Sequence, residues 1–296
     1  MFSKVLVGVD GRQGGRDAAA LATRLMARGG TLTLAHIYRD EGGPRVRGYD
    51  DHEAAEIGRS RALLQAANDV PGIDVHLRWS ASDSAGRGLH QMAEGMHADL
   101  VVVGSTRRGT IGRILIGDDT RATLNDAPCA VAVAPADYAN RAAAIGKIGV
   151  GYDGSPESER ALSTARALAK QLDATLAVMA VAWFPADLLG RPGADDDTST
   201  QDLIEDAYDR VASLGDVEPH AAFGEPAEAL AAWSESLDVL VLGSRGGGTL
   251  TRLVQGSTSQ ELARNARCPL VVVTPADRKA AAAGSEVRPD TVPMVG

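Results

Sequence analysis

The chain alternates short apolar runs with segments whose apolar residues recur at helical spacing. In the first half, apolar runs predict strands at residues 5–9, 32–37, 75–79, 100–103 and 130–134. Helical spacing predicts helices between them at residues 16–27, 53–68, 85–96 and 120–125. Continuously apolar strands are typical of a parallel sheet that is covered on both faces. The pattern therefore predicts an α/β fold with a five-stranded parallel sheet and helices on both faces.

The second half repeats the first. The run Lys4-Val-Leu-Val-Gly-Val-Asp10-Gly11 returns as Lys147-Ile-Gly-Val-Gly-Tyr-Asp153-Gly154, and later blocks recur in the same order at a nearly constant offset. Such self-similarity indicates duplication. We expect two tandem domains, residues 1–141 and 142–276, followed by an Ala-, Gly- and Pro-rich tail at 277–296 that is disordered. The apolar last strands of the copies are expected to pair as an internal pseudo-dimer, with a further homodimer as an open possibility.

Composition narrows the classes of function. The formal net charge of −9 disfavours a general nucleic-acid binder, which needs a basic face. No apolar run approaches the roughly 20 residues that span a bilayer, and the N-terminus lacks a signal-peptide pattern, so no membrane partner is expected. The two cysteines, Cys129 and Cys268, occupy one repeated position before a strand. They suggest core packing in a reducing cytoplasm rather than a disulfide framework.

Candidate binding residues follow the strands. Parallel sheets bind ligands beyond the carboxyl ends of their strands, which directs attention to Asp10, Asp153, Gly104 and Gly243. After its fourth strand the second copy reads Gly243-Ser-Arg-Gly246-Gly247-Gly248, and then Gly256-Ser257-Thr258 before a helical stretch. Glycines permit close backbone approach to a ligand, and free N–H groups at a helix start suit a phosphate. A tight loop with a Ser/Thr helix cap and no ligand is the alternative.

The spacing Gly243-x2-Gly246-x9-Gly256-Ser257 resembles the phosphate-binding signature of ATP-binding universal stress proteins. The resemblance implies flavodoxin-like, Rossmann-like domains that bind an adenine nucleotide: ATP, ADP or cyclic AMP, with or without Mg²⁺. It also implies a stress-response role with an unknown protein partner rather than one known reaction. It assigns phosphate contacts to Gly243, Gly246, Gly256 and Ser257, and we include the adjacent Gly247 and Thr258 among the nucleotide-binding residues. It further implies that Asp153 and Gly154 lie near the adenine and ribose, and that the Val181 backbone meets the adenine edge.

The first copy departs from this signature. Arg107 replaces the second glycine and Asp118 replaces the serine, so a long side chain crowds the loop and a carboxylate competes with phosphate. Matches to the family pattern remain at Asp10, Gly11, Ile37, Gly104 and Gly117. We expect a weak or non-binding first site, with a different nucleotide or a metal-bridged mode as the alternative.

Three functions remain open. The chain lacks the P-loop motif G-x-x-x-x-G-K-[ST], and its six histidines show no metal-ligand spacing, so no resident metal site and no catalytic residues are assigned. The first hypothesis is a nucleotide-binding stress-response regulator. A slow ATPase or phosphotransferase is the second, with at most weak ATP hydrolysis. A nucleotide-free interaction protein is the third, and the glycine–serine pattern of the second copy counts against it.

Overall fold

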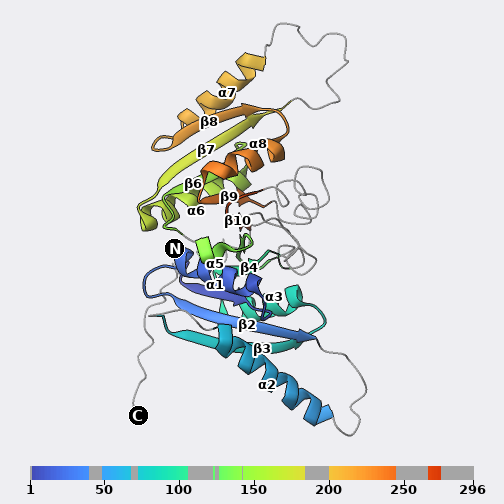
Figure 1. The fold of residues 1–296 in the computed structure, drawn as a ribbon. Helices are drawn as coiled ribbons and strands as arrows, with labels where there is room; N and C mark the ends of the chain where they lie inside the picture. Colours follow the sequence, from blue (N-terminus) through green and yellow to red (C-terminus); the bar gives the residue numbers. More distant parts are fainter. Residues whose placement is uncertain are drawn as a thin grey trace, which may run out of the picture.

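The two halves of the chain build one continuous sheet. The computed structural model describes residues 2–39, 49–67, 73–105, 123, 127–141, 143–183, 200–244 and 266–274. Ten strands lie in the order β3-β2-β1-β4-β5-β10-β9-β6-β7-β8. From the centre of the sheet to either edge, the corresponding strands of the two halves follow one another in the same order. Figure 1 shows the blue-to-cyan first half below and the green-to-orange second half above.

The first half supplies β1 (Lys4–Gly8), β2 (Thr31–Arg39), β3 (Val75–Ser82), β4 (Leu100–Gly104) and β5 (Ala130–Ala134). The second half supplies β6 (Lys147–Gly151), β7 (Thr175–Ala182), β8 (Glu218–Phe223), β9 (Val239–Gly243) and β10 (Leu270–Val273). Neighbouring strands within each half are parallel. The halves meet where β5 pairs antiparallel with β10, Val131 standing opposite Val272. The predicted parallel α/β fold is confirmed, and the copies join through their last strands as expected.

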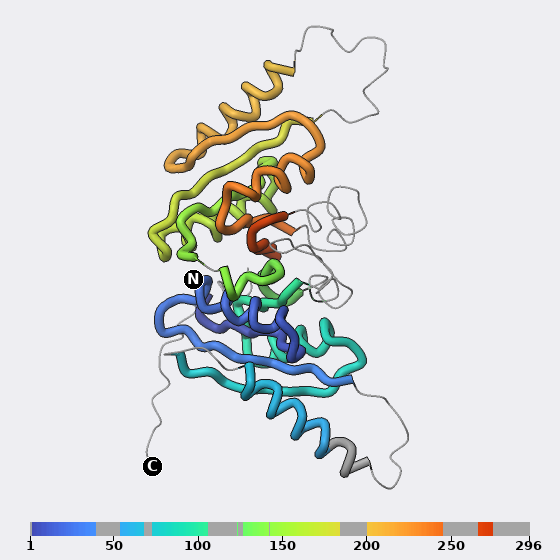
Figure 2. Tube along the Cα trace, in the orientation of Figure 1, coloured from blue at the N-terminus to red at the C-terminus, as the bar shows by residue number. Residues whose placement is uncertain are grey.

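Helices cover both faces of this sheet. They are α1 (Gln13–Leu25), α2 (Tyr49–Ala67), α3 (Ala85–Met96), α5 (Tyr138–Arg141), α6 (Pro156–Leu172), α7 (Thr200–Ala212) and α8 (Pro226–Trp233), with a 3-10 turn at Ser234–Ser236. Core residues of α1, α2, α6 and α7 pack on one face, and those of α3 and α8 on the other. Each of the two cores contains residues of both halves, so apolar packing runs across the β5–β10 junction. Figure 2 traces the chain through both halves, from blue at the N-terminus to red at β10.

The first helix begins earlier than the sequence pattern predicts. We expected its start at residue 16, since two glycines precede Arg16, but α1 begins at Gln13. Gly14 and Gly15 are helical because the helix passes close to the sheet there. A Cβ on Gly14 would lie 3.1 Å from the Ser105 carbonyl oxygen, and one on Gly15 would lie 3.0 Å from Val9 Cγ1.

A short linker helix, α5, was not predicted. It is held by Asp17 of α1, whose side chain is buried. The Asp17 carboxylate accepts hydrogen bonds from the backbone N–H groups of Asp137 and Ala139, each at 2.9 Å. Asp17 lies more than a hundred residues before these partners, so no local pattern announces the helix.

Two further contacts join the halves. Gln171 Nε2 of α6 donates to the carbonyl oxygens of Leu25 and Met26 at the end of α1, at 3.3 and 3.2 Å. Arg24 of α1 donates to the Ala143 carbonyl oxygen at 2.6 Å. No helix in the described part of the chain is long and apolar enough to cross a membrane.

Candidate functional site

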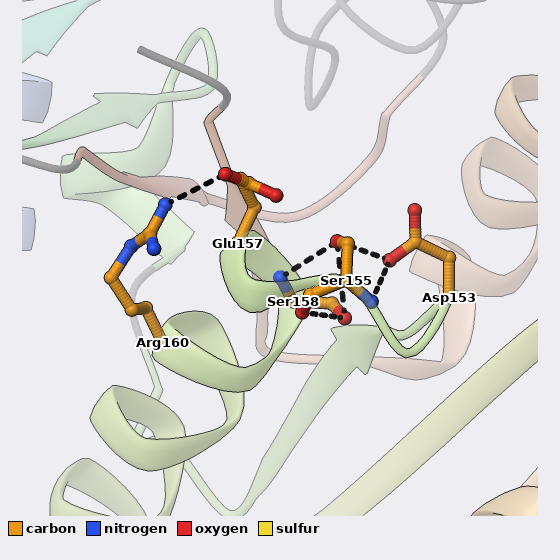
Figure 3. A network of polar contacts seen from close by, with 5 residues as sticks. All are labelled: Asp153, Ser155, Glu157, Ser158 and Arg160. Carbon is orange, nitrogen blue, oxygen red and sulfur yellow. Dashed lines mark hydrogen bonds and ion pairs between the residues drawn. The ribbon is translucent and has the colours of Figure 1, made fainter.

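The second copy has an Asp-Gly-Ser turn at the carboxyl end of β6. Asp153 Oδ1 accepts a hydrogen bond from the Ser155 backbone N–H at 2.9 Å and another from the Ser155 hydroxyl. Gly154 has a φ of +78°, a left-handed conformation that costs glycine little. Ser155 then caps α6, because its Oγ accepts from the Ser158 N–H at 3.2 Å (Figure 3). The turn is thereby fixed in place before any ligand arrives.

The first turn of α6 also holds its charges in a fixed arrangement. Arg160 lies 3.2 Å from Glu157, as Figure 3 shows, and the acidic side chains Glu157 and Glu159 suit the positive end of the helix dipole. Tyr152, just before Asp153, donates its hydroxyl to Glu159. This hydrogen bond, together with burial, raises the pKa of Tyr152 to about 12. Sequence reasoning missed Tyr152, because nothing in the local pattern shows that residue 159 returns to it.

The first copy has the same turn without the cap. Asp10 Oδ1 accepts from the Arg12 N–H at 3.0 Å, and Gly11 again has a φ of +78°. Arg12 stands where the second copy has Ser155, and α1 has no side-chain cap. The surroundings differ as well. A Cβ on Gly11 would lie 2.9 Å from Leu63 Cδ1 of α2, so this turn is covered by that helix.

By contrast, the turn in the second copy is open. Among the described residues, nothing lies within 4 Å of a Cβ placed on Gly154. Asp153 and Gly154 are both exposed. No described residue of the second copy therefore takes the place that Leu63 of α2 takes in the first.

Val181 presents its backbone to that space. The Met179 carbonyl oxygen accepts from the Tyr152 N–H at 2.9 Å, and the Ala182 carbonyl oxygen accepts from the Gly224 N–H at 3.0 Å. Successive residues of a strand direct their N–H and C=O groups to opposite neighbours. Val181 therefore directs its groups to the same side as Met179. The register of β6 against β7 ends at Gly151 opposite Met179, so no described strand residue stands opposite Val181 on that side.

Ile37 has the matching position in the first copy. The Ala35 carbonyl oxygen accepts from the Val9 N–H at 2.8 Å, so Ile37 directs its backbone beyond the end of β1. Here His36 Nδ1 lies 2.8 Å from the Val9 carbonyl oxygen. A carbonyl can only accept a hydrogen bond, so this contact requires the proton on Nδ1. In the second copy Ala180 takes the place of His36, so the residue at this position of β7 carries no ring.

Gly243 and Gly104 have a structural role that the sequence did not reveal. We interpreted them as permitting close approach of a ligand. A Cβ on Gly243 would lie 2.1 Å from the Glu157 carbonyl oxygen, and one on Gly104 would lie 2.1 Å from the Gly14 carbonyl oxygen. In the two copies the first turn of α1 or of α6, the helix that follows β1 or β6, therefore passes directly over the end of β4 or β9. Both glycines are required by the fold, whether or not a ligand also contacts them.

The structure brings part of the predicted site together. Asp153, Gly154, Val181 and Gly243 all lie at the carboxyl ends of the adjacent strands β7, β6 and β9. The remaining assigned positions lie outside the described residues: Gly246, Gly247, Gly256, Ser257, Thr258 and, in the first copy, Arg107, Gly117 and Asp118. Within the described ranges, no group of three or more His, Cys, Asp or Glu side chains is arranged to hold a metal ion.

These features define a class of protein: two parallel α/β domains of the doubly wound type, fused through their last strands. The chain belongs to the universal stress protein family. The family's sequence model matches it twice, over residues 1–135 and 144–274.

Relatives and solved structures agree. The universal stress protein Rv2005c of Mycobacterium tuberculosis is 30% identical over 291 residues, which covers 90% of this chain and 96% of the relative. A universal stress protein of Thermus aquaticus is 33% identical over 138 residues and covers 44% of this chain, about one copy. Among crystal structures, a universal stress protein from Archaeoglobus fulgidus aligns with a TM-score of 0.64 at 20% identity, covering 92% of this chain and 96% of its own.

Proposed function

We propose that the second copy binds an adenine nucleotide, ATP foremost, and that the bound state regulates a protein partner in a stress response. The observation that carries this proposal is the open edge at β6 and β7. The Val181 backbone offers one donor and one acceptor side by side, which is what the edge of an adenine base requires. Asp153 lies beside it on a turn that is already ordered.

The phosphates belong, in this proposal, to the segment after β9. Gly246, Gly247, Gly256, Ser257 and Thr258 follow Gly243 with the family's spacing. Backbone N–H groups and hydroxyls at a helix start stabilise phosphate charge, and Mg²⁺ would accompany a triphosphate. The described residues contribute no cluster of metal ligands, so such an ion would be bound mainly through the nucleotide.

We further propose that the first copy binds the same nucleotide weakly. Leu63 of α2 covers the Gly11 turn, and Asp118 and Arg107 replace residues of the phosphate signature. These differences act in the same direction, because Leu63 reduces the space beside the turn, the long side chain of Arg107 crowds the loop and the Asp118 carboxylate repels phosphate. The buried free thiols Cys129 and Cys268 fit a reducing compartment, and the cytoplasm is where we place this function.

Calorimetric titration with ATP tests the assignment through a matched pair of variants. Asp153→Ala should weaken binding, while Asp10→Ala should leave it nearly unchanged. Ser257→Asp, which gives the second copy the residue found in the first, should abolish binding. Thermal melting of each variant controls for folding. Equal loss in Asp10→Ala and Asp153→Ala, or loss in Asp10→Ala alone, would reverse the assignment of the site.

The enzyme hypothesis has a separate test. A regulator should retain bound nucleotide, identified by mass spectrometry of the purified protein, and show negligible ATP turnover with or without Mg²⁺. Turnover that Gly246→Arg abolishes would favour the slow ATPase or phosphotransferase. Absence of any nucleotide binding would favour the nucleotide-free interaction protein.

A further inference from the structure

Trp183 is an exposed tryptophan at the edge of the candidate site. Its side chain is 52% exposed, more than Tyr208 at 45% and Phe223 at 40%, the other exposed large hydrophobic side chains of the described residues. Within the described part of the chain, the rings of His220 and Trp233 contact each other, and Trp183 is not part of that contact. Single exposed hydrophobic residues are common on protein surfaces, so exposure alone decides nothing. The position of Trp183 is what makes it informative.

The backbone at Trp183 is held in place by the neighbouring strand. Ala182 stands opposite Phe223 in the register of β7 and β8, and the Gly224 N–H donates to the Ala182 carbonyl oxygen at 3.0 Å. Trp183 therefore follows a strand that is paired up to its last residue. It lies two residues beyond Val181, whose backbone is directed into the open edge.

Strand alternation fixes the side of the sheet. Val178 and Ala180 belong to the core under α6 and α7, so the side chain of Val181 lies on the opposite face, toward α8. Residues two apart in an extended chain share a face. Trp183 directly follows β7, and continuing this alternation by one residue would carry its indole on the same side as the Val181 side chain. A base whose edge bonds to the Val181 backbone would have one of its flat faces on this side.

We propose, on the basis of the nucleotide function above, that Trp183 stacks on the base in the second site and makes that site prefer purines. Stacking on an aromatic ring accepts every base, but a two-ring purine covers more of an indole than a pyrimidine does. The first copy lacks this platform. Ala35 pairs with Gly8 in the first copy as Met179 pairs with Gly151 in the second, so Ala35 and Met179 correspond. Four residues further along each chain segment, Arg39 therefore corresponds to Trp183.

Fluorescence and calorimetric titrations with ATP and UTP test this inference on the full chain. ATP should quench the tryptophan emission of the unmodified protein, and Trp183→Ala should remove that quenching although Trp79 and Trp233 remain. ATP should bind Trp183→Ala roughly 5- to 150-fold more weakly, the range that loss of one base–aromatic stack produces. UTP binding should weaken by a smaller factor. Trp183→Phe should give an intermediate ATP affinity.

Tyr208→Ala is the matched control, because Tyr208 is an exposed aromatic residue of the same half on α7. It should leave both titrations unchanged. Unaltered ATP affinity in Trp183→Ala overturns the stacking role while the nucleotide function stands. Equal losses for ATP and UTP overturn the purine preference. An unmodified protein that binds neither nucleotide overturns this inference together with the proposed function.

Discussion

Glycine at the end of a central strand is where a single residue has the largest consequence in this fold. Gly104 and Gly243 occupy corresponding positions, and the backbone of α1 lies against Gly104 as that of α6 lies against Gly243. A backbone carbonyl cannot move aside as a flexible side chain can, so a methyl group there must displace the helix. The same helices, α1 and α6, follow the Asp-Gly turns of the two candidate sites.

Gly243→Ala should therefore destabilise the protein by about 1–3 kcal/mol or more, as overpacking in a close-packed region does. Urea unfolding with and without ATP measures the loss. Gly58→Ala is a suitable control: Gly58 lies within α2, no described residue outside the helix's own backbone lies within 4 Å of a Cβ placed on it, and alanine there should stabilise the helix by roughly 0.8–1 kcal/mol. A fully stable Gly243→Ala protein that had lost only nucleotide binding would show that the glycine serves the ligand and not the fold.

Three protonated side chains make the folded state sensitive to alkaline pH. Burial raises the pKa of Tyr138 and of Cys268 to about 12, and the hydrogen bond to Glu159 with burial does the same for Tyr152. In the unfolded chain these groups ionise near their ordinary pKa values of 9.0 for cysteine and 10.0 for tyrosine. The folded protein thus binds more protons between these values and 12, and its stability falls as pH rises through that range.

Urea unfolding at intervals from pH 8 to pH 11 should show this decline. Tyr152→Phe removes one ionisable hydroxyl, so its stability should fall less steeply with pH above 10. Identical slopes for the two proteins would mean that Tyr152 ionises equally easily in the folded and unfolded chains.

At the scale of elements, the two copies reach the same fold with different packing. Val9 and His36 are neighbours at the ends of β1 and β2, and Tyr152 and Ala180 correspond to them at β6 and β7. In each pair one side chain carries a ring and the other is small. In the first copy the ring belongs to His36 on β2, whereas in the second it belongs to Tyr152, directly after β6. Total volume is thereby conserved, which cores tolerate well, while the surroundings of the two candidate sites become different.

Repeated aspartates fasten the strands at their amino ends. Asp99 accepts from the Ser3 N–H at 2.7 Å and the Lys4 N–H at 3.0 Å, just before β1 and at its first residue. Asp238 accepts from the Gly146 and Lys147 N–H groups, each at 2.8 Å. Each carboxylate satisfies backbone donors that β1 or β6 would otherwise leave unpaired.

Asp238→Ala should cost about 1–3 kcal/mol of the free energy of unfolding, because two backbone donors lose their acceptor. Asp238→Asn retains an acceptor oxygen at the same position and should lose clearly less. Denaturant unfolding of the two variants provides the comparison, and equal losses would point to the charge rather than the hydrogen bonds.

At the scale of the whole molecule, the two domains share one sheet and both apolar cores, so we expect them to unfold together. Three kinds of contact cross the junction between the halves. The main chains of β5 and β10 pair, and both apolar cores contain residues of both halves. Gln171 also donates hydrogen bonds to the end of α1. Edge strands left unpaired by separation would be prone to association. The junction therefore stabilises both halves at once.

We expect a single unfolding transition by calorimetry, with equal calorimetric and van't Hoff enthalpies. Val131→Pro in β5 removes an N–H that is directed at β10 and should lower the midpoint of that transition for the whole chain. Two transitions in the unmodified protein, or a shift confined to one of two transitions in the variant, would contradict a shared core.

The sequence by itself determined the duplication, the parallel α/β fold, the joining of the copies through their last strands, and the strand ends at which Asp10 and Asp153 lie. These features follow from local patterns, because apolar runs, helical spacing and turn residues each depend on a few neighbouring positions. The duplication makes the same patterns occur in both copies. Even the exact bounds of β5 and α3 agree with the predicted ranges.

Tertiary structure alone decided what surrounds those strand ends. Several contacts join residues whose proximity no local pattern encodes. Leu63 covers Gly11, and Glu157 lies against Gly243. Tyr152 donates to Glu159, and Asp17 accepts from the backbone of α5. The direction of the Val181 backbone likewise depends on where β6 stops beside β7. Such contacts depend on how separate elements pack, so two copies with the same pattern of strands and helices acquire different sites.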